Sequence, residues 1–512
     1  MNKIYFGIVT LLVLFTGCTK LDEKMYDTVP FEKYPENPQQ VSTLGLSAYS
    51  PLKDFLDNGG WWFCQEITTD EMVGPTRNTD WNDNGKWRSL QLHTWTNETE
   101  AVVGMWDRYY SGVFNCNQTI FVVSNEGDTA LLTKDQKLIV AKMMAMRAFY
   151  YWLLIDNYGD VPYSTSFLHA VAAPFKSKRA DIFNNIVREL KWAIPQMKNG
   201  SIHYGISKAA AQMTLARLYL NAEVYTGTPM YDKCIEVLEQ LKNDGAYSLA
   251  ITVKEPFVTN NDDCPENIFT IYYNGTENLT NPKYPEFNLH MRTLGYQSNL
   301  TFGMAVGPWN GFATLEKHFK LYSDNDLRKK AYFLFGPQKT IDGKDLMDAE
   351  TNSIWDFTPE IPALVISETN GDTKAQVRHS GVRVQKYEIA KGAGQSLAND
   401  YVIFRLTDAY LMLAECYAIV GNTGKVKENL DPIRSRAGLT DAITYDLDAV
   451  KLERRREMFY EGTRRQDMIR WGTYNTNWWA ATSGEFNTAN SNLFPIPKKQ
   501  TDANPNLLSN AQ

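Results

Sequence analysis

The stretch from residue 61 to residue 96 mixes aromatic rings with carboxylates and amides. At its centre, within Thr79–Gly85, Trp81 stands among two aspartates and two asparagines. An indole in so polar a segment is poorly placed for a hydrophobic core. Sugar rings have apolar C–H faces and hydroxyl rims, so they bind where an aromatic plane lies beside groups that hydrogen-bond hydroxyls. The segment therefore has the chemistry to hold a sugar ring.

A second loop, Gly307–Phe312, offers an indole beside an amide in a tight turn set by glycine and proline. If the two loops meet, they form one aromatic site. The ligand-binding residues that we predict for it are Trp81, Trp309, Asp70, Arg77, Asp80, Asn84, Asn310 and Tyr296. For the other tryptophans of the first stretch (Trp61, Trp62, Trp87 and Trp95), we favour packing in the core. No basic residues gather around the loops, which favours neutral sugars.

The elements that position these loops are predicted to be mainly helical. Apolar periodicity predicts helices over 98–125, 133–158, 179–198, 207–225, 229–244, 407–418, 424–437 and 448–471, with Thr133 as an N-cap. Small residues in 209–220 and 407–418 allow close helix packing, and a second helix follows each. These pairs predict tetratricopeptide-like helical hairpins that form a scaffold.

A large insertion separates the helical repeats, which span about 98–245 and 401–472. Residues 246–400 are rich in Asn, Thr, Gly, Tyr and Phe, and two runs, 268–273 and 381–387, are typical of strands. We expect a loop-rich region with a few short strands. Long ordered loops on a rigid scaffold are common places for binding sites.

The N-terminal segment has the pattern of a signal peptide. Lys3 and the apolar run Ile4–Phe15 predict a signal peptide over 1–17, since the run is too short to span a bilayer. Small residues before Cys18 favour a bacterial lipoprotein, with this cysteine acylated. A plain secretory signal with an incidental cysteine is the alternative. Prolines in 18–40 predict an extended tether.

Composition excludes several classes. The net charge is −7 and the pI is near 5.6, which argues against nucleic-acid binding. Neither CxxC nor HxxxH occurs, so we expect no metal site and no cofactor. The cysteines other than Cys18 are odd in number and scattered, which favours buried free thiols.

Residues 448–471 interleave arginines with acids at helical spacing. One interpretation is a partly buried lattice of ion pairs that locks the last helix onto the scaffold, because both signs neutralise each other locally. The other is an anion site or a catalytic carboxylate pair. We favour the lattice.

Several segments resemble the SusD/RagB family of outer-membrane lipoproteins. They are Arg147–Trp152, Tyr158–Pro162, the helix 407–418, Glu453–Gly462, Arg464–Gly472, Pro495–Pro497 and Asn504–Asn506. The resemblance implies a single SusD-like domain over 41–512 with four tetratricopeptide-like units. It also implies a lipid-anchored, cell-surface protein of the outer membrane. Such a protein would bind oligo- or polysaccharide beside a SusC-like TonB-dependent transporter.

Three functional hypotheses follow from these observations. The first is a non-catalytic glycan-binding lipoprotein that passes glycan to the transporter. The second is a surface glycosidase, which needs two carboxylates flanking the bond, and Asp70 with Asp80 or Asp83 could be tried in that role. The third is a scaffold whose helical repeats dock other proteins.

Overall fold

The computed structural model describes residues 43, 45–124, 128–169, 171–200, 205–274, 287–479, 482, 484–489 and 491–508. The predicted signal peptide 1–17, Cys18 and the tether 18–40 lie outside the described residues. From Leu44 onward the chain forms one compact unit.

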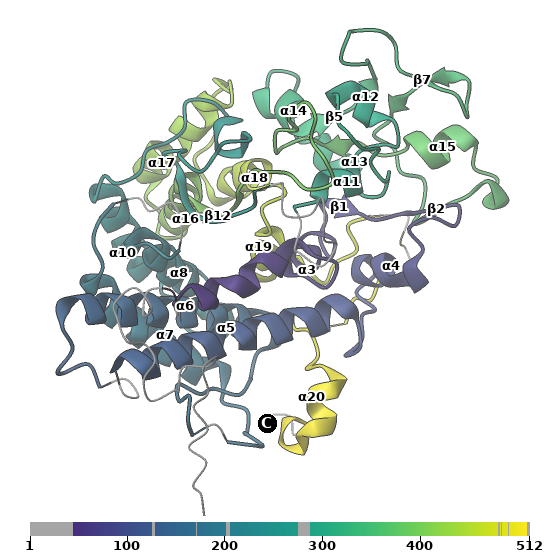
Figure 1. Cartoon of the computed structure of the whole chain (residues 1–512). Helices are drawn as coiled ribbons and strands as arrows, with labels where there is room; N and C mark the ends of the chain where they lie inside the picture. The colour runs from purple at the N-terminus through teal and green to yellow at the C-terminus, as the bar shows by residue number, and fades with distance from the viewer. Residues whose placement is uncertain are drawn as a thin grey trace, which may run out of the picture. The chain divides into compact units, whose positions relative to one another are not determined.

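The helical scaffold is built from the predicted segments. Its helices are η2 (Ser47–Leu56), α5 (Glu100–Ser124), α6 (Lys134–Tyr158), α7 (Arg179–Ala193), α8 (Lys208–Leu220), α9 (Ala222–Thr226), α10 (Tyr231–Asn243), α16 (Leu406–Ile419), α17 (Thr423–Arg436), α18 (Leu447–Glu457) and α19 (Arg464–Arg470). Helices that are near in sequence pack as pairs, α5 on α6, α8 on α10 and α16 on α17, and α10 also packs on α16. The two predicted hairpins therefore lie side by side although the large insertion separates them in sequence (Figure 1).

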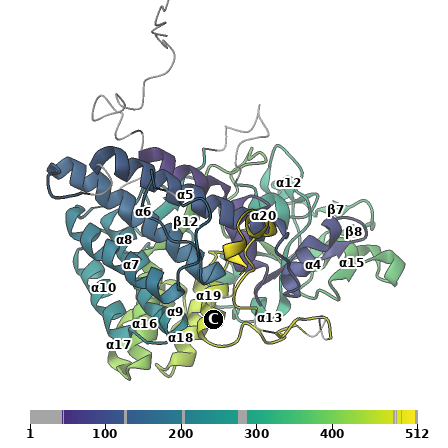
Figure 2. The same cartoon turned by 90° about the horizontal axis from the view of Figure 1, so that it is seen from below.

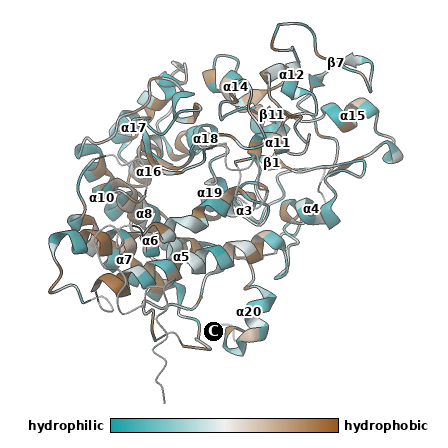
Figure 3. Cartoon of the chain, in the orientation of Figure 1, coloured by the Kyte–Doolittle hydropathy of each residue, from teal (hydrophilic) through white to brown (hydrophobic). Residues whose placement is uncertain are grey.

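Helix α6 forms the centre of this scaffold. Thr133 caps it with a full capping box, as predicted. The most apolar window of the helix has a mean hydropathy of 1.5, and 78% of that window is buried inside the protein, as in the core helix of a globular domain. Figure 3 shows hydrophobic residues running through the stack of α6, α8 and α10, whereas α4 (Lys86–Gln91) is mostly polar.

A second region, the loop-rich lobe, lies beside the scaffold in both views (Figures 1 and 2). Its helices are short: α11 (Leu289–Thr293), α12 (Ser298–Phe302), α13 (Glu316–Phe319), α14 (Leu327–Tyr332) and α15 (Lys374–His379). Strands β3 (Asn267–Ile271) and β12 (Tyr401–Arg405) pair antiparallel and so join the two ends of the insertion. The mainly helical fold with a loop-rich insertion is confirmed.

All sheets among the described residues are two-stranded. The remaining strands are β1 (Met72–Val73), β2 (Thr76–Arg77), β4 (Ala313–Thr314), β5 (Phe333–Leu334), β6 (Gly336–Pro337), β7 (Met347–Asp348), β8 (Ser353–Ile354), β9 (Asp356–Phe357), β10 (Val365–Ile366) and β11 (Arg383–Val384). β1 pairs with β4 and β2 with β10. These two ladders attach the N-terminal segment that follows α3 (Trp61–Glu66) to the lobe, and Figure 1 shows β1 and β2 at its lower edge.

The single helix predicted over 448–471 is wrong, because the chain breaks it between α18 and α19. Tyr460 and Gly462 have φ values of 72° and 67° in this break. A Cβ on Gly462 would lie 2.2 Å from the Trp61 ring, so only glycine fits there. The break turns the chain so that α19 packs on α3.

The predicted ion-pair lattice is confirmed, and we use that name for the buried charges around α18 and α19. Arg405 contacts Glu266, Glu457 and Glu461 within 3.0 Å, and all four side chains are fully or almost fully buried. Arg454 bridges Asp408 and Asp467 at 2.7 Å each. The lattice joins the scaffold to the base of the lobe and leaves its charges paired inside the protein.

The C-terminal segment runs along the outside of the scaffold. It ends in α20 (Lys498–Ala503) and the 3₁₀ turn η8 (Pro505–Leu507). Figure 1 shows α20 below α5, at the bottom of the view.

Candidate functional site

The loop that carries Trp81 is held in an unusual backbone conformation. Asn78, Trp81, Asp83 and Asn84 have positive φ values of 55°, 58°, 38° and 54°. Asparagine and aspartate tolerate the left-handed region, but a bulky tryptophan is an outlier there. Such strain persists only where surrounding contacts impose it, and it is concentrated at functional sites.

Local hydrogen bonds impose this conformation. The backbones of Arg77 and Asp80 exchange two hydrogen bonds of 2.9 and 3.0 Å, which close a tight turn just before Trp81. The Trp87 indole N–H donates to the Asp83 carboxylate at 2.5 Å. These hydrogen bonds hold the chain on both sides of Trp81.

The loop that carries Trp309 is anchored on α11. The backbone N–H groups of Trp309, Asn310 and Gly311 donate to carbonyls of Met291, Leu294 and Arg292 at 2.7 to 2.9 Å. The guanidinium of Arg292 lies over the Trp309 ring, 5.5 Å from its centre. This loop is therefore a rigid part of the lobe.

The two loops meet, as the sequence predicts. The Trp81 indole N–H donates to the Trp309 carbonyl at 2.8 Å. The Tyr296 hydroxyl donates to the Asp80 carboxylate, also at 2.8 Å. Between the loops lies an open cavity of about 440 Å³, which we call the aromatic cleft. It is lined by Asn58, Asp80, Trp81, Asp83, Trp87, Arg292, Tyr296, Pro308 and Trp309.

The floor beneath Trp81 explains the glycine at 311. A Cβ on Gly311 would lie 2.3 Å from the Trp81 ring, closer than real contacts allow. Buried Phe312 packs against the same indole with ring centres 5.1 Å apart. The backbone of Gly311 and the phenyl ring, whose plane is tilted by 52° to the indole, thus support the Trp81 ring and leave it half exposed.

The polar groups of the cleft are mostly acceptors. Asp80 and Asp83 are exposed carboxylates, and Arg292 is the one guanidinium among the lining residues. Burial, together with the hydrogen bond to Asp80, raises the pKa of Tyr296 to about 12, so its hydroxyl stays protonated. Carboxylates beside half-exposed aromatic rings can hold hydroxyl groups, and they repel anions.

Arg77 and Asn310 were predicted to contact a ligand, but the structure buries both. Arg77 is 2% exposed, and its guanidinium donates to the carbonyls of Gly311, Val377 and Ser380. Asn310 is fully buried between the Arg378 carbonyl, to which it donates, and Arg383, from which it accepts. Burial lowers the pKa of Arg77 to about 10. Both side chains position the Trp309 loop instead.

Asp70 also lies elsewhere. Its carboxylate is 11% exposed, accepts two hydrogen bonds from Arg464 at 2.7 and 3.0 Å, and pairs with Arg455 at 2.8 Å. It lines a different cavity from Asp80. Asn84 stays on the surface of its loop and is not among the residues lining the cleft.

Sequence reasoning missed five lining residues: Asn58, Asp83 as a ligand, Trp87, which was assigned to the core, Arg292 and Pro308. Asp83 and Pro308 lie in the same loops as the predicted residues Trp81 and Trp309, so their closeness in sequence could have identified them. Arg292 and Asn58 come from α11 and the turn before α3, and no local pattern marks them. The predicted core tryptophans Trp61, Trp62 and Trp87 are 7%, 0% and 1% exposed, which confirms the prediction for these three. Trp95 is only half buried, against His93 and Phe494. Among the described residues, no cluster could hold a metal ion.

A helical-hairpin scaffold, a loop-rich lobe and an open aromatic cleft define the SusD-type class of fold. The "Surface glycan-binding protein A from Bacteroides thetaiotaomicron" superposes with a TM-score of 0.72 at 20% identity, covering 91% of this chain and 97% of its own. A "Laminarin binding SusD-like protein" gives a TM-score of 0.73 at 19% identity, with 91% and 98% covered.

Sequence comparisons agree with the fold. The model of the SusD family matches residues 269–512, and a model described as "Starch-binding associating with outer membrane" matches residues 52–220. The "Starch-binding protein SusD" of Bacteroides thetaiotaomicron is 26% identical, over 90% of this chain and 88% of its own length. The chain belongs to the SusD/RagB family.

Proposed function

We propose that this protein is a non-catalytic glycan-binding lipoprotein and that the aromatic cleft is its binding site. The observation that carries the proposal is the meeting of Trp81 and Trp309 from loops more than 200 residues apart, joined by a hydrogen bond across the cleft. The names of the relatives support it, since one is called starch-binding and another laminarin-binding. Trp81, Trp309, Tyr296, Asp80 and Asp83 are the residues that we expect to contact the glycan.

The charge of the cleft supports a neutral oligo- or polysaccharide. Asp80 and Asp83 outnumber the single guanidinium of Arg292 along the lining, so a uronic or sulfated chain would meet repulsion. The cavity of about 440 Å³ lies within the range of roughly 300–1,000 Å³ usual for small-ligand sites, enough for a few sugar units rather than a whole chain.

The geometry speaks against the glycosidase that Asp70 with Asp80 or Asp83 would require. Two catalytic carboxylates must face the same bond. Asp70 is held by Arg464 and Arg455 and lines another cavity, whereas Asp80 and Asp83 line the cleft. Binding without cleavage is therefore the function that the arrangement supports.

The proposal extends to the cellular setting. Cys18 would carry the lipid and residues 18–40 the tether, which together would hold the protein on the outer surface of the outer membrane. Acyl chains contribute about 0.8 kcal/mol per buried CH₂, so several chains would anchor the protein firmly. From there it would pass glycan to a SusC-like TonB-dependent transporter. The "outer membrane" in the matched family description supports this placement.

A glycan array followed by calorimetric titration tests the binding role. We expect saturable binding of at least one neutral glycan, and loss of that binding in Trp81→Ala. The bound oligosaccharide should be recovered at unchanged length after a day with the protein. Shortened products would establish an enzyme, and wild-type protein that binds no glycan would leave the protein-docking scaffold as the better hypothesis.

A further inference from the structure

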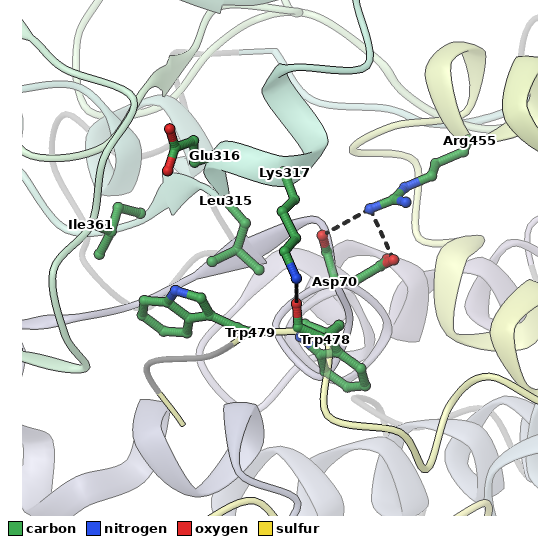
Figure 4. A pocket seen from close by; sticks show the side chains of 8 residues that line it. All are labelled: Asp70, Leu315, Glu316, Lys317, Ile361, Arg455, Trp478 and Trp479. Atoms are coloured by element: carbon green, nitrogen blue, oxygen red, sulfur yellow. Dashed lines mark hydrogen bonds and ion pairs between the residues drawn. The ribbon is translucent and has the colours of Figure 1, made fainter. Parts of the chain in front are cut away.

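A second cavity, of about 370 Å³, lies next to the ion-pair lattice (Figure 4). It is lined by Asp70, Leu315, Glu316, Lys317, Ile361, Arg455, Trp478 and Trp479. Its residues come from five separate parts of the chain: the segment before β1, the start of α13, the loop between β9 and β10, α18, and the loop after α19. The aromatic cleft shares none of them.

One side of this cavity is apolar. Leu315 and Ile361 belong to a buried hydrophobic cluster, and Trp479 packs against that cluster while staying half exposed. Figure 4 shows Leu315, Ile361 and the Trp479 ring gathered on one side. Among the described residues, no other aromatic ring packs on Trp479 and no acceptor meets its indole N–H. The Trp479 indole thus packs on the hydrophobic cluster and keeps part of its surface accessible to a ligand.

The other side is polar and ordered. Burial opposes ionisation of Asp70, but Arg464 and Arg455 outweigh it and hold the pKa of this carboxyl well below its usual range. The carboxylate is therefore a permanent acceptor. The Lys317 ammonium donates to the Trp478 carbonyl at 2.9 Å, which fixes the Trp478–Trp479 segment and leaves further N–H groups for a ligand.

The ladder of β1 and β4 separates the two sites. Successive side chains of a strand point to opposite faces. Phe312 packs on Trp81 of the aromatic cleft, whereas Ala313 and Leu315 lie in the cluster behind Trp479. The ladder therefore separates the two cavities, and each cavity can bind a ligand independently of the other.

We propose that this cavity is a second carbohydrate site, which takes a short saccharide end between the Trp479 ring and the polar groups of Asp70 and Lys317. The proposal rests on the proposed glycan-binding function. It has the same two parts as the aromatic cleft: an indole plane for the C–H face of a sugar and fixed groups for its hydroxyls. Two sites on one chain would raise the apparent affinity for a long polysaccharide without any new contact to a short one.

The test compares Trp81→Ala, Trp479→Ala and the double variant with the wild type. A neutral glycan from the array is used both as its hexasaccharide in calorimetry and as its polysaccharide in affinity gels. Saturating hexasaccharide should fill two sites per chain in the wild type and one in either single variant. Trp479→Ala should weaken retention on polysaccharide by about five- to 150-fold, the range expected on losing a stacked ring. It should leave the hexasaccharide affinity of the remaining site within about twofold.

Trp479→Phe keeps a ring and should retain most of the second site, whereas Trp192→Ala, a half-buried tryptophan that lines neither cavity, controls for altered stability. If the wild type binds one hexasaccharide per chain and Trp479→Ala is retained on the polysaccharide as the wild type is, the second site is refuted. The proposed glycan-binding function would then still stand. If Trp479→Ala loses binding and Trp81→Ala binds as the wild type does, the second site is supported and the aromatic cleft is refuted as the main site. Wild-type protein that binds no glycan would end both.

Discussion

The ion-pair lattice and the aromatic cleft use similar residues in opposite ways. In the lattice, Glu457 contacts Arg328, Arg405 and Arg436 within 3.0 Å and is 0% exposed. In the cleft, Asp80 is exposed and shares its carboxylate with a single tyrosine hydroxyl and the backbone N–H of Trp81. The lattice pairs its charges with one another, and the cleft leaves capacity for a ligand.

The difference separates the segment that carries the family resemblance from the proposed binding site. The charged groups of the Arg/Glu segment pair with one another inside the protein, which favours a structural role over a catalytic or anion-binding one. The cleft stands on short loops fixed by neighbouring backbone. Variants should therefore affect stability in the first region and affinity in the second.

The largest effect is expected for Glu457→Ala. The change leaves three buried guanidinium groups without their shared carboxylate, and breaking a buried pair typically costs about 3–5 kcal/mol of unfolding free energy. Urea unfolding followed by circular dichroism measures it. Glu428→Ala, which breaks an exposed pair with Lys425, should change stability by less than about 1 kcal/mol. Equal effects of the two variants would contradict the assigned role of the lattice.

The lattice should also show a distinctive pH dependence through Glu71. Burial, opposed by Arg464 but reinforced by Asp70, raises the pKa of Glu71 above its ordinary value of 4.5. A raised carboxyl pKa means that its stabilising contribution is present below the unfolded pKa and is lost as pH rises toward the folded pKa. The wild type should therefore lose stability relative to Glu71→Gln as pH rises above about 5, by up to about 1.4 kcal/mol per pH unit.

Unfolding curves of both proteins from pH 5 to pH 8 check this sign. Glu316→Gln, a half-buried carboxylate paired with exposed Lys320, serves as the control and should run parallel to the wild type. Parallel curves for Glu71→Gln as well would show that Glu71 titrates normally.

The cleft should respond to Trp81→Ala with a loss of affinity rather than of stability. Removal of a half-exposed stacking ring should weaken glycan binding by about 1–3 kcal/mol, by analogy with aromatic stacking on nucleic-acid bases. Calorimetric titration measures the affinity and thermal unfolding the stability. Affinity retained within twofold would refute the role of Trp81.

Local patterns predicted most of the scaffold and only part of the site. The scaffold was predicted because its signals lie in short stretches of sequence. They are the N-cap Thr133, the small residues of α8 and α16, and the alternating charges of α18. The break at Tyr460 and Gly462 was missed because it depends on contact with Trp61, distant in sequence. Arg77 and Asn310 were assigned to the ligand because their types suit it. Their burial depends on β2–β10 pairing and on Arg383, which no local pattern reveals.

The smallest effect is expected for Gly311→Ala, which changes the support of Trp81 without touching its ring. The added methyl would lie 2.3 Å from the indole, so the Trp81 ring must shift away from residue 311. The ring has room to move because it is half exposed. We expect glycan affinity to fall by about fivefold, or roughly 1 kcal/mol, with little change in unfolding. Gly394→Ala, where the methyl meets nothing within 4 Å, is the matched control. Wild-type affinity in Gly311→Ala together with a loss in Trp81→Ala would show that the ring binds glycan without needing its fixed plane. A cleft that requires rigid rings predicts losses in both.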